Sequence, residues 1–468
     1  MRAVRFLLLG FTVGLFGCER NPSRQAPPVS VAADAALTVS SGTVDGKGDG
    51  GAPPVGSASA AAEAKPYNVL LITIDSLRAD MPWAGYARPI APRLSALHAR
   101  SVSYKNAYST SSFTSKSVAG LLTGRYPSEL ARTGRFFTKY LSAESFVCTH
   151  LGKRGIPCVG GHGHMYFGPG QSGFETGFEA WKLVPGITFD YQTDPYVTSD
   201  KLTPLAIEML KDVSKDDSRP FFAWFHYMDP HDEYKPHRES AHLRPETGAR
   251  RARDLYDEEV FFTDLWIGKL LDFVESQPWS NRTAIVVTAD HGEAFGEHGV
   301  TRHAHEVWEE LVHVPLFFYV PGATSRVVEA TRGHVDLAPT FVELLGAKDM
   351  PTLPGTSLVP EITGQTPAVE AEDAIRDVIV DLPEDDYNER RRALIHGRTK
   401  LIAFGEDVRF ALYDLDADPR EDKDLVREKP ELYAEMRRRY REACSKIKDV
   451  PPRGGIPRKS KNDKAKAN

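Results

Sequence analysis

Short apolar runs alternate with amphipathic segments along most of this chain, and this alternation constrains the fold more than any other feature. It is typical of an α/β fold with a mostly parallel sheet that helices cover on both faces. Five runs are expected to form strands: Asn68 to Ile74, Pro157 to Gly160, Phe221 to Tyr227, Thr283 to Thr288 and Val314 to Val320. The roughly 380 residues between the two tails suffice for a large α/β domain with a smaller appendage.

Side chains that can bind a metal follow two of these expected strands. Asp75 comes directly after the first run, and Asp290 with His291 follows the fourth. Alone, each aspartate could cap a helix or hold a turn. Ligand sites of open α/β sheets form at the carboxyl ends of the strands, so the three residues together are candidate metal ligands.

A Ser/Thr-rich loop leads into a short helix of small residues over Phe113 to Pro127, which reads FTSKSVAGLLTGRYP. Its second half, LLTGRYP, resembles the segment that follows the nucleophile in type I sulfatases of the alkaline phosphatase superfamily. Counting back from Thr123 places Thr114 where those sulfatases carry the Cys that is oxidised to formylglycine. The resemblance therefore implies a sulfatase scaffold with a different nucleophile.

Two further segments carry the same resemblance. Residues 72–80 are similar to the first metal-binding segment of sulfatase-like enzymes, and residues 288–299 are similar to the second. The match extends from about Tyr67 to Leu425. It implies an alkaline-phosphatase-like sheet sandwiched by helices in residues 66–345, and a small C-terminal α+β subdomain in residues 346–449 that completes the fold.

The resemblance also implies one divalent ion, bound by Asp75, Asp290, His291 and the hydroxyl oxygen of Thr114. Sulfatases usually place a second Asp directly after the first, whereas this chain has Ser76. An all-oxygen calcium site is less secure without that carboxylate, and a mixed set with an imidazole suits manganese or zinc about as well. Calcium, manganese and zinc therefore remain open.

The identity of the nucleophile affects which type of ester the enzyme can cleave. A metal-bound hydroxyl at a helix N-terminus can attack phosphorus or sulfur. A formylglycine hydrate carries a second hydroxyl that expels sulfate, but Thr114 has none, so its ester must be released by attack at the central atom. Phosphate or phosphodiester chemistry on a glycan or lipid headgroup is therefore favoured, by hydrolysis or transfer. Hydrolysis of sulfate esters on glycans is the alternative, and a catalytically silent protein that binds anionic glycans is another.

The family register suggests further residues of the pocket. His231 and His303 are expected to act on the ester and its leaving group, while Lys116, His162 and His305 are expected to contact the substrate. His164 competes with His162 for the same position. Each of these histidines could instead be an ordinary surface or capping residue, and Lys116 could be an exposed lysine of the first helical turn.

The first residues of the chain indicate export. Arg2 and Arg5 precede an apolar run that ends at Cys18, which is typical of a lipoprotein signal peptide over residues 1–18. We expect a membrane anchor at Cys18 facing the periplasm or cell exterior, a flexible tether over residues 19–65, and a solvated basic tail over 450–468. The net charge of −6 gives no indication of nucleic-acid binding.

The chain has four cysteines, too few for a disulfide framework. Cys148 lies on an expected helix and Cys158 on the strand after it. In an exported protein the two could form a disulfide, or they could be two buried thiols.

Overall fold

The computed structural model describes residues 66–187, 196–244, 251–366 and 375–454. Its central feature is an eight-stranded sheet with the order β10-β2-β9-β6-β1-β5-β3-β4. The strands are β1 (Asn68–Ile74), β2 (Val102–Tyr108), β3 (Cys158–His162), β4 (Ala180–Leu183), β5 (Phe222–Tyr227), β6 (Thr283–Ala289), β9 (Leu316–Tyr319) and β10 (Arg326–Gly333). Only β9 runs antiparallel to its neighbours β2 and β6, which confirms the predicted mostly parallel sheet.

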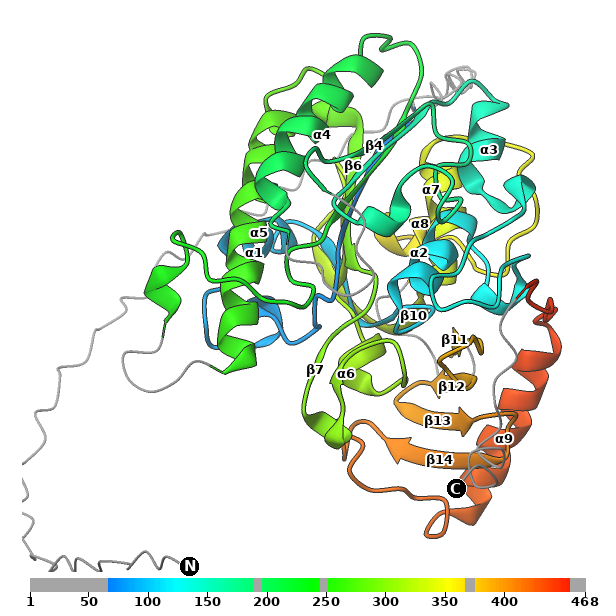
Figure 1. Ribbon diagram of the computed structural model, residues 1–468. Coiled ribbons are helices and arrows are strands. Elements are labelled where there is room, and N and C mark those ends of the chain that lie inside the picture. Colours follow the sequence, from blue (N-terminus) through cyan, green and yellow to red (C-terminus); the bar gives the residue numbers. More distant parts are fainter. Residues whose placement is uncertain (1–65, 188–195, 245–250, 367–374, 455–468) are drawn as a thin grey trace, which may run out of the picture. The chain divides into compact units, whose positions relative to one another are not determined.

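Side chains alternate between the two faces of the sheet and define two helical layers (Figure 1). Val69 and Leu71 of β1 face a core that includes α2 (Thr114–Thr123), α3 (Val147–Gly152), α7 (Leu337–Leu344) and α8 (Val359–Ile362). Leu70 and Ile72 face the opposite core, which includes α1 (Pro92–His98), α4 (Ser199–Val213) and α5 (Ala252–Glu275). Because both faces of β1 are covered, all seven of its residues are buried, and only Asn68 and Thr73 are polar.

A second sheet follows the large one in the chain. It contains the antiparallel strands β11 (Asp377–Leu382), β12 (Arg391–His396), β13 (Thr399–Phe404) and β14 (Arg409–Asp414) in sequence order. Helix α9 (Pro430–Ser445) packs on it through Met436 and Tyr440. The predicted small C-terminal α+β part is therefore confirmed, while its boundary at residue 346 stays a prediction.

The two sheets share a hydrophobic cluster. Tyr108 and Phe113, from β2 and the loop before α2, pack with Val380 and Ile395 of the second sheet. The same cluster receives side chains from the segment between β6 and β9, which contains β7 (Ala294–Phe295), β8 (Thr301–Arg302) and α6 (Glu309–Val312). The second sheet thus supports the start of α2 and the loops beside it.

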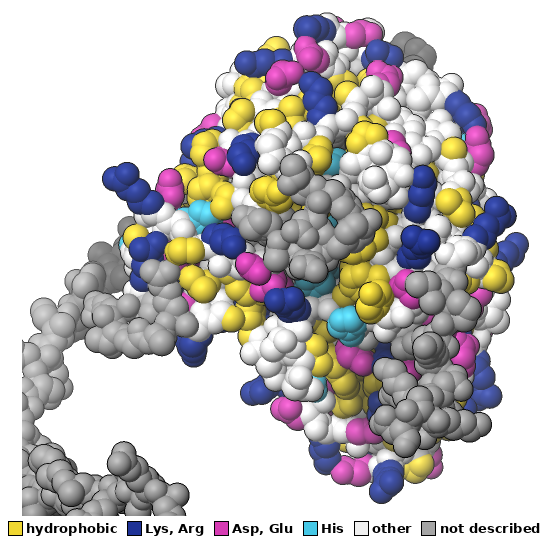
Figure 2. Space-filling model, in the orientation of Figure 1, with side chains coloured by type: hydrophobic (Ala, Val, Ile, Leu, Met, Phe, Trp, Pro, Cys, Tyr) yellow, Lys and Arg dark blue, Asp and Glu magenta, His cyan; other side chains and the backbone are white. Residues whose placement is uncertain are grey.

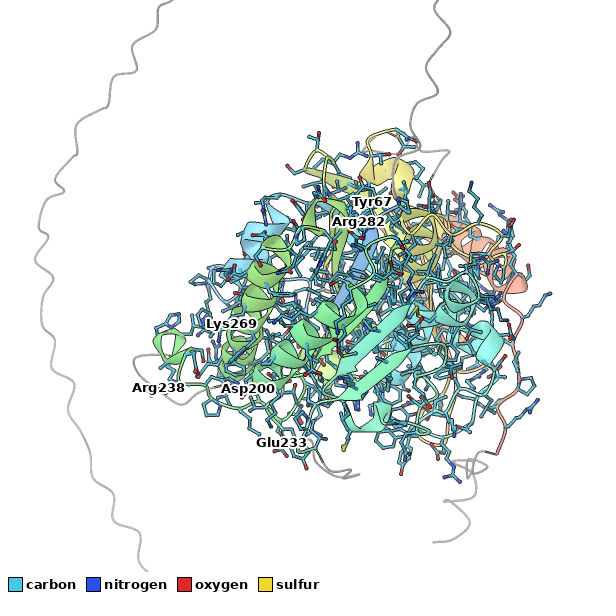
Figure 3. The ribbon with its side chains drawn as sticks, turned by 90° about the horizontal axis from the view of Figure 1, so that it is seen from above. Tyr67, Asp200, Glu233, Arg238, Lys269 and Arg282 are labelled. Carbon is cyan, nitrogen blue, oxygen red and sulfur yellow. A yellow bond between two sulfur atoms is a disulfide. The ribbon has the colours of Figure 1, made fainter. Side chains whose placement is uncertain are left out.

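The parallel strands point their carboxyl ends in one direction. Seen from above, Tyr67 and Arg282, which precede β1 and β6, lie near each other at one end, and Glu233, which follows β5, lies toward the opposite end (Figure 3). Residues that follow β1, β5 and β6 therefore meet at a single edge of the sheet.

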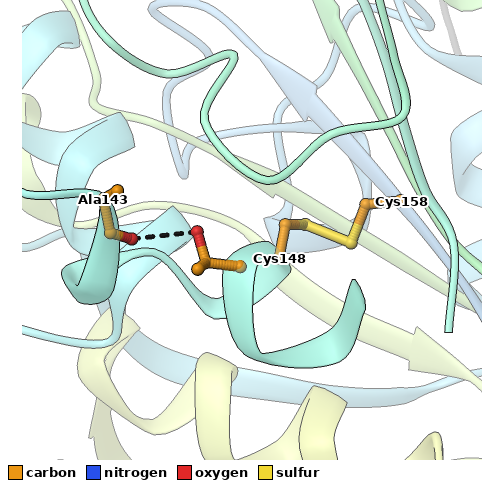
Figure 4. The surroundings of a disulfide bond; sticks show 4 residues. Ala143, Cys148 and Cys158 are labelled. Atoms are coloured by element: carbon orange, nitrogen blue, oxygen red, sulfur yellow. Dashed lines mark hydrogen bonds between the residues drawn. A yellow bond between two sulfur atoms is a disulfide. The ribbon is translucent and has the colours of Figure 1, made fainter. Parts of the chain in front are cut away.

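A disulfide joins Cys148 of α3 to Cys158 of β3, with Cα atoms 5.9 Å apart. It settles the alternative between a bridge and two thiols in favour of the bridge. Figure 4 shows it beside the hydrogen bond that Thr149 Oγ1 donates to Ala143 O, at 2.9 Å. The expected signal peptide, lipid anchor at Cys18 and tether lie outside the described residues. Within the described parts, no helix combines the length and apolar character that a membrane span requires.

Candidate active site

Asp75, Asp290 and His291 come together at the carboxyl edge of the sheet. β1 and β6 pair in parallel with Ile74 opposite Ala289, so the residues that follow each strand are neighbours. One ligand atom from each of the three residues lies within 4.8 Å of the others. All three side chains are completely buried.

Thr114 reaches the same point from the first turn of α2. Its Oγ1 lies 2.9 Å from Nε2 of His291, and only 2% of the residue is exposed. Ser117, one turn along, donates a hydrogen bond to Asp290 O and fixes the helix against the metal-ligand segment. Gly120 has no side chain because a Cβ there would lie 2.3 Å from Thr110 Oγ1.

The hydrogen bonds of His291 define which of its nitrogens faces Thr114. Nδ1 lies 2.9 Å from the carbonyl oxygen of Gly292, which can only accept, so Nδ1 carries the proton. Nε2 therefore presents a lone pair to Thr114 and to the two carboxylates, at 3.4 Å from Asp290 Oδ2 and 3.6 Å from Asp75 Oδ1. Such an imidazole nitrogen can accept a proton or bind a metal.

The site has the features of a cation-binding site. Oδ2 of Asp290 is buried and has no hydrogen-bond partner among the described residues. Burial and the charge of Asp75 raise the pKa of Asp290 well above its ordinary value. Within the described part of the chain, no lysine or arginine forms an ion pair with either carboxylate. Two carboxylates, one imidazole lone pair and one hydroxyl converging on a buried point fit a divalent ion.

Ser76 occupies the place of the second sulfatase carboxylate. Its backbone has a positive φ of 57°. Its N–H donates to Oδ1 of Asp290 at 3.3 Å, and its hydroxyl donates to Oδ1 of Asp75 at 3.1 Å. Ser76 thus orients both predicted ligands and adds no negative charge.

His226, which the sequence reasoning missed, supports Asp75 from the neighbouring strand β5. Its Nε2 lies 3.1 Å from Asp75 Oδ2, and its Nδ1 lies 2.8 Å from Thr73 Oγ1. Trp224 donates a further hydrogen bond to that threonine at 2.9 Å. The sequence feature that could have pointed to His226 is its place on β5. There His226 and Trp224, two side chains with ring N–H groups, lie on the same face of an otherwise mostly apolar strand.

His303 packs against His291, one of the candidate metal ligands. Its ring centre is 4.2 Å from that of His291, and its Nδ1 is 3.3 Å from Glu293 Oε1. Burial lowers the pKa of His303, but the charges of Glu293 and Asp75 outweigh it and raise that pKa above the ordinary value. A cationic imidazole here can face an anionic ester. The sequence alone did not indicate a role for Glu293.

His231 lies next to His303, with ring centres 4.9 Å apart. Its Nδ1 donates to the carbonyl oxygen of Asp232, so Nε2 is the free ring nitrogen. His231 follows β5 at the same edge of the sheet. The two predicted catalytic histidines are therefore adjacent, and their roles remain predictions.

Lys116 does not occupy the predicted position. It is neither an exposed first-turn lysine nor a free cation facing the substrate, because its ammonium group pairs with Asp385 and both side chains are 1% exposed. Burial lowers the pKa of Lys116, while Asp385 opposes this effect. Asp385 lies between β11 and β12 and could not be connected with Lys116 from the sequence.

His162 does not fit a substrate-binding position either. It is completely buried against Trp181 and Phe167, and this burial lowers its pKa to about 3. Its alternative His164 is nearer the site, with its ring centre 6.3 Å from that of His231. His305 is exposed, donates a hydrogen bond to Asn388 Oδ1 and lines a pocket, so its contact with substrate remains a prediction.

Comparison with known proteins identifies the family. The family described as Sulfatase matches residues 67–347, which is more than half of the chain. The chain belongs to the sulfatase family. Residues 296–448 additionally match the family described as N-sulphoglucosamine sulphohydrolase, C-terminal, in agreement with the second sheet.

This sulfatase-family hydrolase has similar relatives among known sequences and structures. An ulvan-active sulfatase of Formosa agariphila is 28% identical over 357 residues, covering 67% of this chain and 68% of the relative. A protein solved with its substrate D-glucosamine-2-N,6-O-disulfate has a TM-score of 0.66, 18% identity and coverage of 83% and 99%. A phosphonate monoester hydrolase of Agrobacterium radiobacter has a TM-score of 0.63, 18% identity and coverage of 84% and 100%. These two structures show the same fold.

Proposed function

We propose that this chain is an exported, metal-dependent enzyme that cleaves a phosphate, phosphodiester or phosphonate ester through Thr114. The observation that carries the proposal is the position of Thr114 Oγ1, 2.9 Å from His291 Nε2 at a buried group of candidate metal ligands. A hydroxyl held in this way is suited to nucleophilic attack.

Asp75, Asp290, His291 and Thr114 would hold the divalent ion. When bound, the ion would supply positive charge that lowers the pKa of the Thr114 hydroxyl and attracts the oxygens of the ester. His303, held by Glu293, lies beside that point and adds a second positive charge when its ring is protonated. Ser76 and His226 keep the two ligand carboxylates in place.

The reaction proceeds in two displacements. Thr114 gives its hydroxyl proton to solvent, and its Oγ1 forms a bond to phosphorus while the bond from phosphorus to the leaving oxygen breaks. The leaving oxygen takes the Nε2 proton of His231 in its imidazolium form, in which Nδ1–H still donates to Asp232 O. Water then attacks phosphorus, returns a proton to Nε2 of His231, and displaces Thr114 Oγ1 as the alkoxide that begins the next cycle. A threonine ester has no second hydroxyl through which to leave, so the second displacement must occur at the central atom.

Sulfate-ester hydrolysis is the second candidate. It is supported by family membership and by the ulvan-active sulfatase among the relatives. The phosphonate monoester hydrolase, which has the same fold, supports the first candidate. A silent binding protein is disfavoured because the candidate ligands, Thr114 and His303 all adjoin one another.

Export is supported by two observations. The first residues carry Arg2 and Arg5 before an apolar run that ends at Cys18. The disulfide between Cys148 and Cys158 suits an oxidising compartment.

A substrate panel tests the proposal directly. Purified enzyme loaded with manganese, zinc or calcium is assayed with p-nitrophenyl phosphate, bis-p-nitrophenyl phosphate, p-nitrophenyl phenylphosphonate and p-nitrophenyl sulfate. We expect turnover of at least one phosphorus ester, and a phosphorus-containing mass on the Thr114 peptide after acid quenching. If p-nitrophenyl sulfate is the only substrate that the enzyme turns over, the proposed phosphorus chemistry is wrong and sulfate-ester hydrolysis takes its place.

A further inference from the structure

A second group of side chains that can bind a metal lies outside the candidate active site. It contains His298, Glu310 and Glu421, and one ligand atom from each lies within 4.8 Å of the others. His298 and Glu310 also line a pocket of about 490 Å³, whose lining includes neither Thr114 nor His291. The group is therefore separate from the place where the ester would be cleaved.

The three side chains come from three separate parts of the chain. His298 belongs to the turn between β7 and β8, Glu310 to α6, and Glu421 to the connection between β14 and α9. Figure 1 shows β7 and α6 beside the second sheet, and the hydrophobic cluster that the two sheets share includes Leu311 and Val312 of α6. An ion held by this group would therefore cross-link the segment between β6 and β9 to the second sheet.

The carboxylate of Glu310 is buried and largely uncompensated. Its side chain is 8% exposed, and its Oε1 has no hydrogen-bond partner among the described residues. Within the same residues its ion-pair neighbour is His298, whose Nε2 lies 4.0 Å from Oε2. A carboxylate in such a position is strongly stabilised by a nearby cation.

The carboxylates around Glu310 leave an excess of negative charge. The ammonium group of Lys400 lies 3.0 Å from Glu309 Oε1 and 3.0 Å from Glu421 Oε1. Together with Glu310, three buried carboxylates thus share one lysine. The excess of two negative charges matches the charge of one divalent ion.

Other cations near the pocket are already paired. The arginines that line it pair with other carboxylates: Arg78 with Asp80, Arg398 with Asp416, and Arg420 with Asp422. Figure 2 likewise shows acidic and basic side chains intermixed over the lower part of the face, where Figure 1 places α6, β13 and β14. An ion from solution is therefore the available partner for Glu310.

The ring of His298 is held toward Glu310 by its surroundings. His298 has a positive φ of 53°, which is unfavourable for a residue with a side chain. Its ring stacks on Trp308 with ring centres 4.1 Å apart and an angle of 13° between the planes. The imidazole therefore needs little reorganisation to bind an ion.

The ligand set indicates the type of ion. An imidazole nitrogen with two carboxylates suits zinc or manganese, whereas calcium and magnesium prefer oxygen ligands throughout. Zinc bonds of about 2.0–2.2 Å place tetrahedral ligand atoms about 3.3–3.6 Å apart, so side-chain movements of about 1 Å close the site around the ion.

We propose that His298, Glu310 and Glu421 bind a second divalent ion, zinc or manganese, which cross-links the segment containing His303 to the second sheet. The ion would stabilise the fold and take no part in the reaction at Thr114. The inference does not depend on the proposed function.

Metal content tests the inference. The full chain is stripped with a chelator, equilibrated with zinc or with manganese, separated from unbound metal and analysed by atomic emission. We expect about two ions per chain in the wild type, and about one in either Glu310→Gln or Asp290→Asn. The double variant should hold neither ion.

Thermal unfolding gives a second readout. In the Asp290→Asn chain, zinc at about a hundredfold excess over its Kd should raise the Tm by about 3–5 °C, and adding Glu310→Gln should abolish this shift. Glu329→Gln is the matched control, because it removes an exposed carboxylate of β10 that pairs with Lys105. It should change neither the metal content nor the shift.

An unchanged metal content in Glu310→Gln would overturn the inference, as would an equal loss of metal in Glu329→Gln. If Glu310→Gln does not fold, His298→Gly takes its place, and retention of both ions in that variant overturns the inference in the same way. Metal content and Tm are measured without substrate. Failure of the ester chemistry and failure of the second metal site are therefore distinguishable.

Discussion

The hydroxyl of Thr114 is the smallest group on which the proposed chemistry depends. Its Oγ1 contacts His291, and its side chain is almost fully buried at the start of α2. Replacement by valine keeps the volume and removes only the hydroxyl. The residue therefore allows packing and catalysis to be separated in one experiment.

We expect Thr114→Val to lower kcat by roughly a thousandfold or more, because a covalent nucleophile has no substitute. The free energy of unfolding should fall by about 0.5–1.5 kcal/mol, the contribution of one hydrogen bond. Steady-state rates and urea unfolding measure the two effects. Ser115→Ala is the matched control, since Ser115 Oγ has no hydrogen-bond partner among the described residues, and it should change kcat little. A Thr114→Val enzyme with full activity would exclude the covalent route.

The ligand assignment can be tested by metal content. Asp290→Asn should weaken metal affinity by about 10–100-fold and reduce the rate in parallel, because one ligand charge is lost. Atomic emission analysis after dialysis against a chelator measures the occupancy. The second group of possible ligands, His298, Glu310 and Glu421, provides the control, because Glu310→Gln should lose the second ion and change the rate little. Loss of metal from Glu310→Gln with full occupancy in Asp290→Asn would place the catalytic ion at that second group.

At the scale of single residues, sequence motifs identify the candidate site residues that directly follow a strand or lie at a fixed distance from a motif. Asp75 and Asp290 were predictable because they directly follow apolar strands, and Thr114 because the motif sets its distance from Thr123. Asp385 was not, since it is 269 residues from Lys116 and lies on a connection between two short strands. Contacts of that range depend on how the two sheets pack, which no local pattern encodes.

Strands were predicted from the sequence where burial on both faces made most of their residues apolar. β1 was predicted to the residue, because five of its seven residues are apolar and all seven are buried. β2, β4 and β10 were missed. β2 contains Lys105 and Asn106, the four residues of β4 are only half-buried, and β10 carries a register shift between Val328 and Thr331. Strands at or near the edges of the sheet lack the continuous apolar signal.

Helix α1 is an element whose start depends on another helix. Ala91 at its N-cap provides no side-chain hydrogen bond, and Asp264 of α5 accepts from the N–H groups of Arg93 and Leu94 at 2.9 and 2.7 Å instead. We expect Asp264→Ala to lower the free energy of unfolding by about 1.5–3 kcal/mol, because two hydrogen bonds to a buried carboxylate are lost. Chemical denaturation with circular dichroism measures the change.

The control for this prediction lies on the same helix. Asp272 pairs with Arg93, but its side chain is 59% exposed. Asp272→Ala should therefore change the stability by less than about 1 kcal/mol. If both variants lose the same stability, the loss reflects the general charge of α5 and not the capping of α1.

At the scale of the whole molecule, the site lies where the two sheets meet. The segment before Thr114 packs on the second sheet, and backbone contacts group the described residues between 66 and 454 into one unit. The carboxyl edge of the large sheet supplies the candidate metal ligands, while the connection between β11 and β12 supplies Asp385, Tyr387 and Asn388. The start of α2 thus depends on contacts with both sheets.

The Lys116–Asp385 ion pair connects α2, which packs on the large sheet, with the second sheet. Its loss should therefore destabilise both parts of the molecule. Lys116→Met leaves the Asp385 carboxylate buried and uncompensated, so we expect a loss of about 3–5 kcal/mol in the free energy of unfolding. Asp385→Leu should cost a similar amount. The double variant should recover much of the loss, because neither charge is then left buried alone. Urea unfolding followed by tryptophan fluorescence and by circular dichroism measures all three variants, and the two probes should report one shared transition. Additive losses in the double variant, or separate transitions for the two probes, would mean that the pair does not couple the sheets.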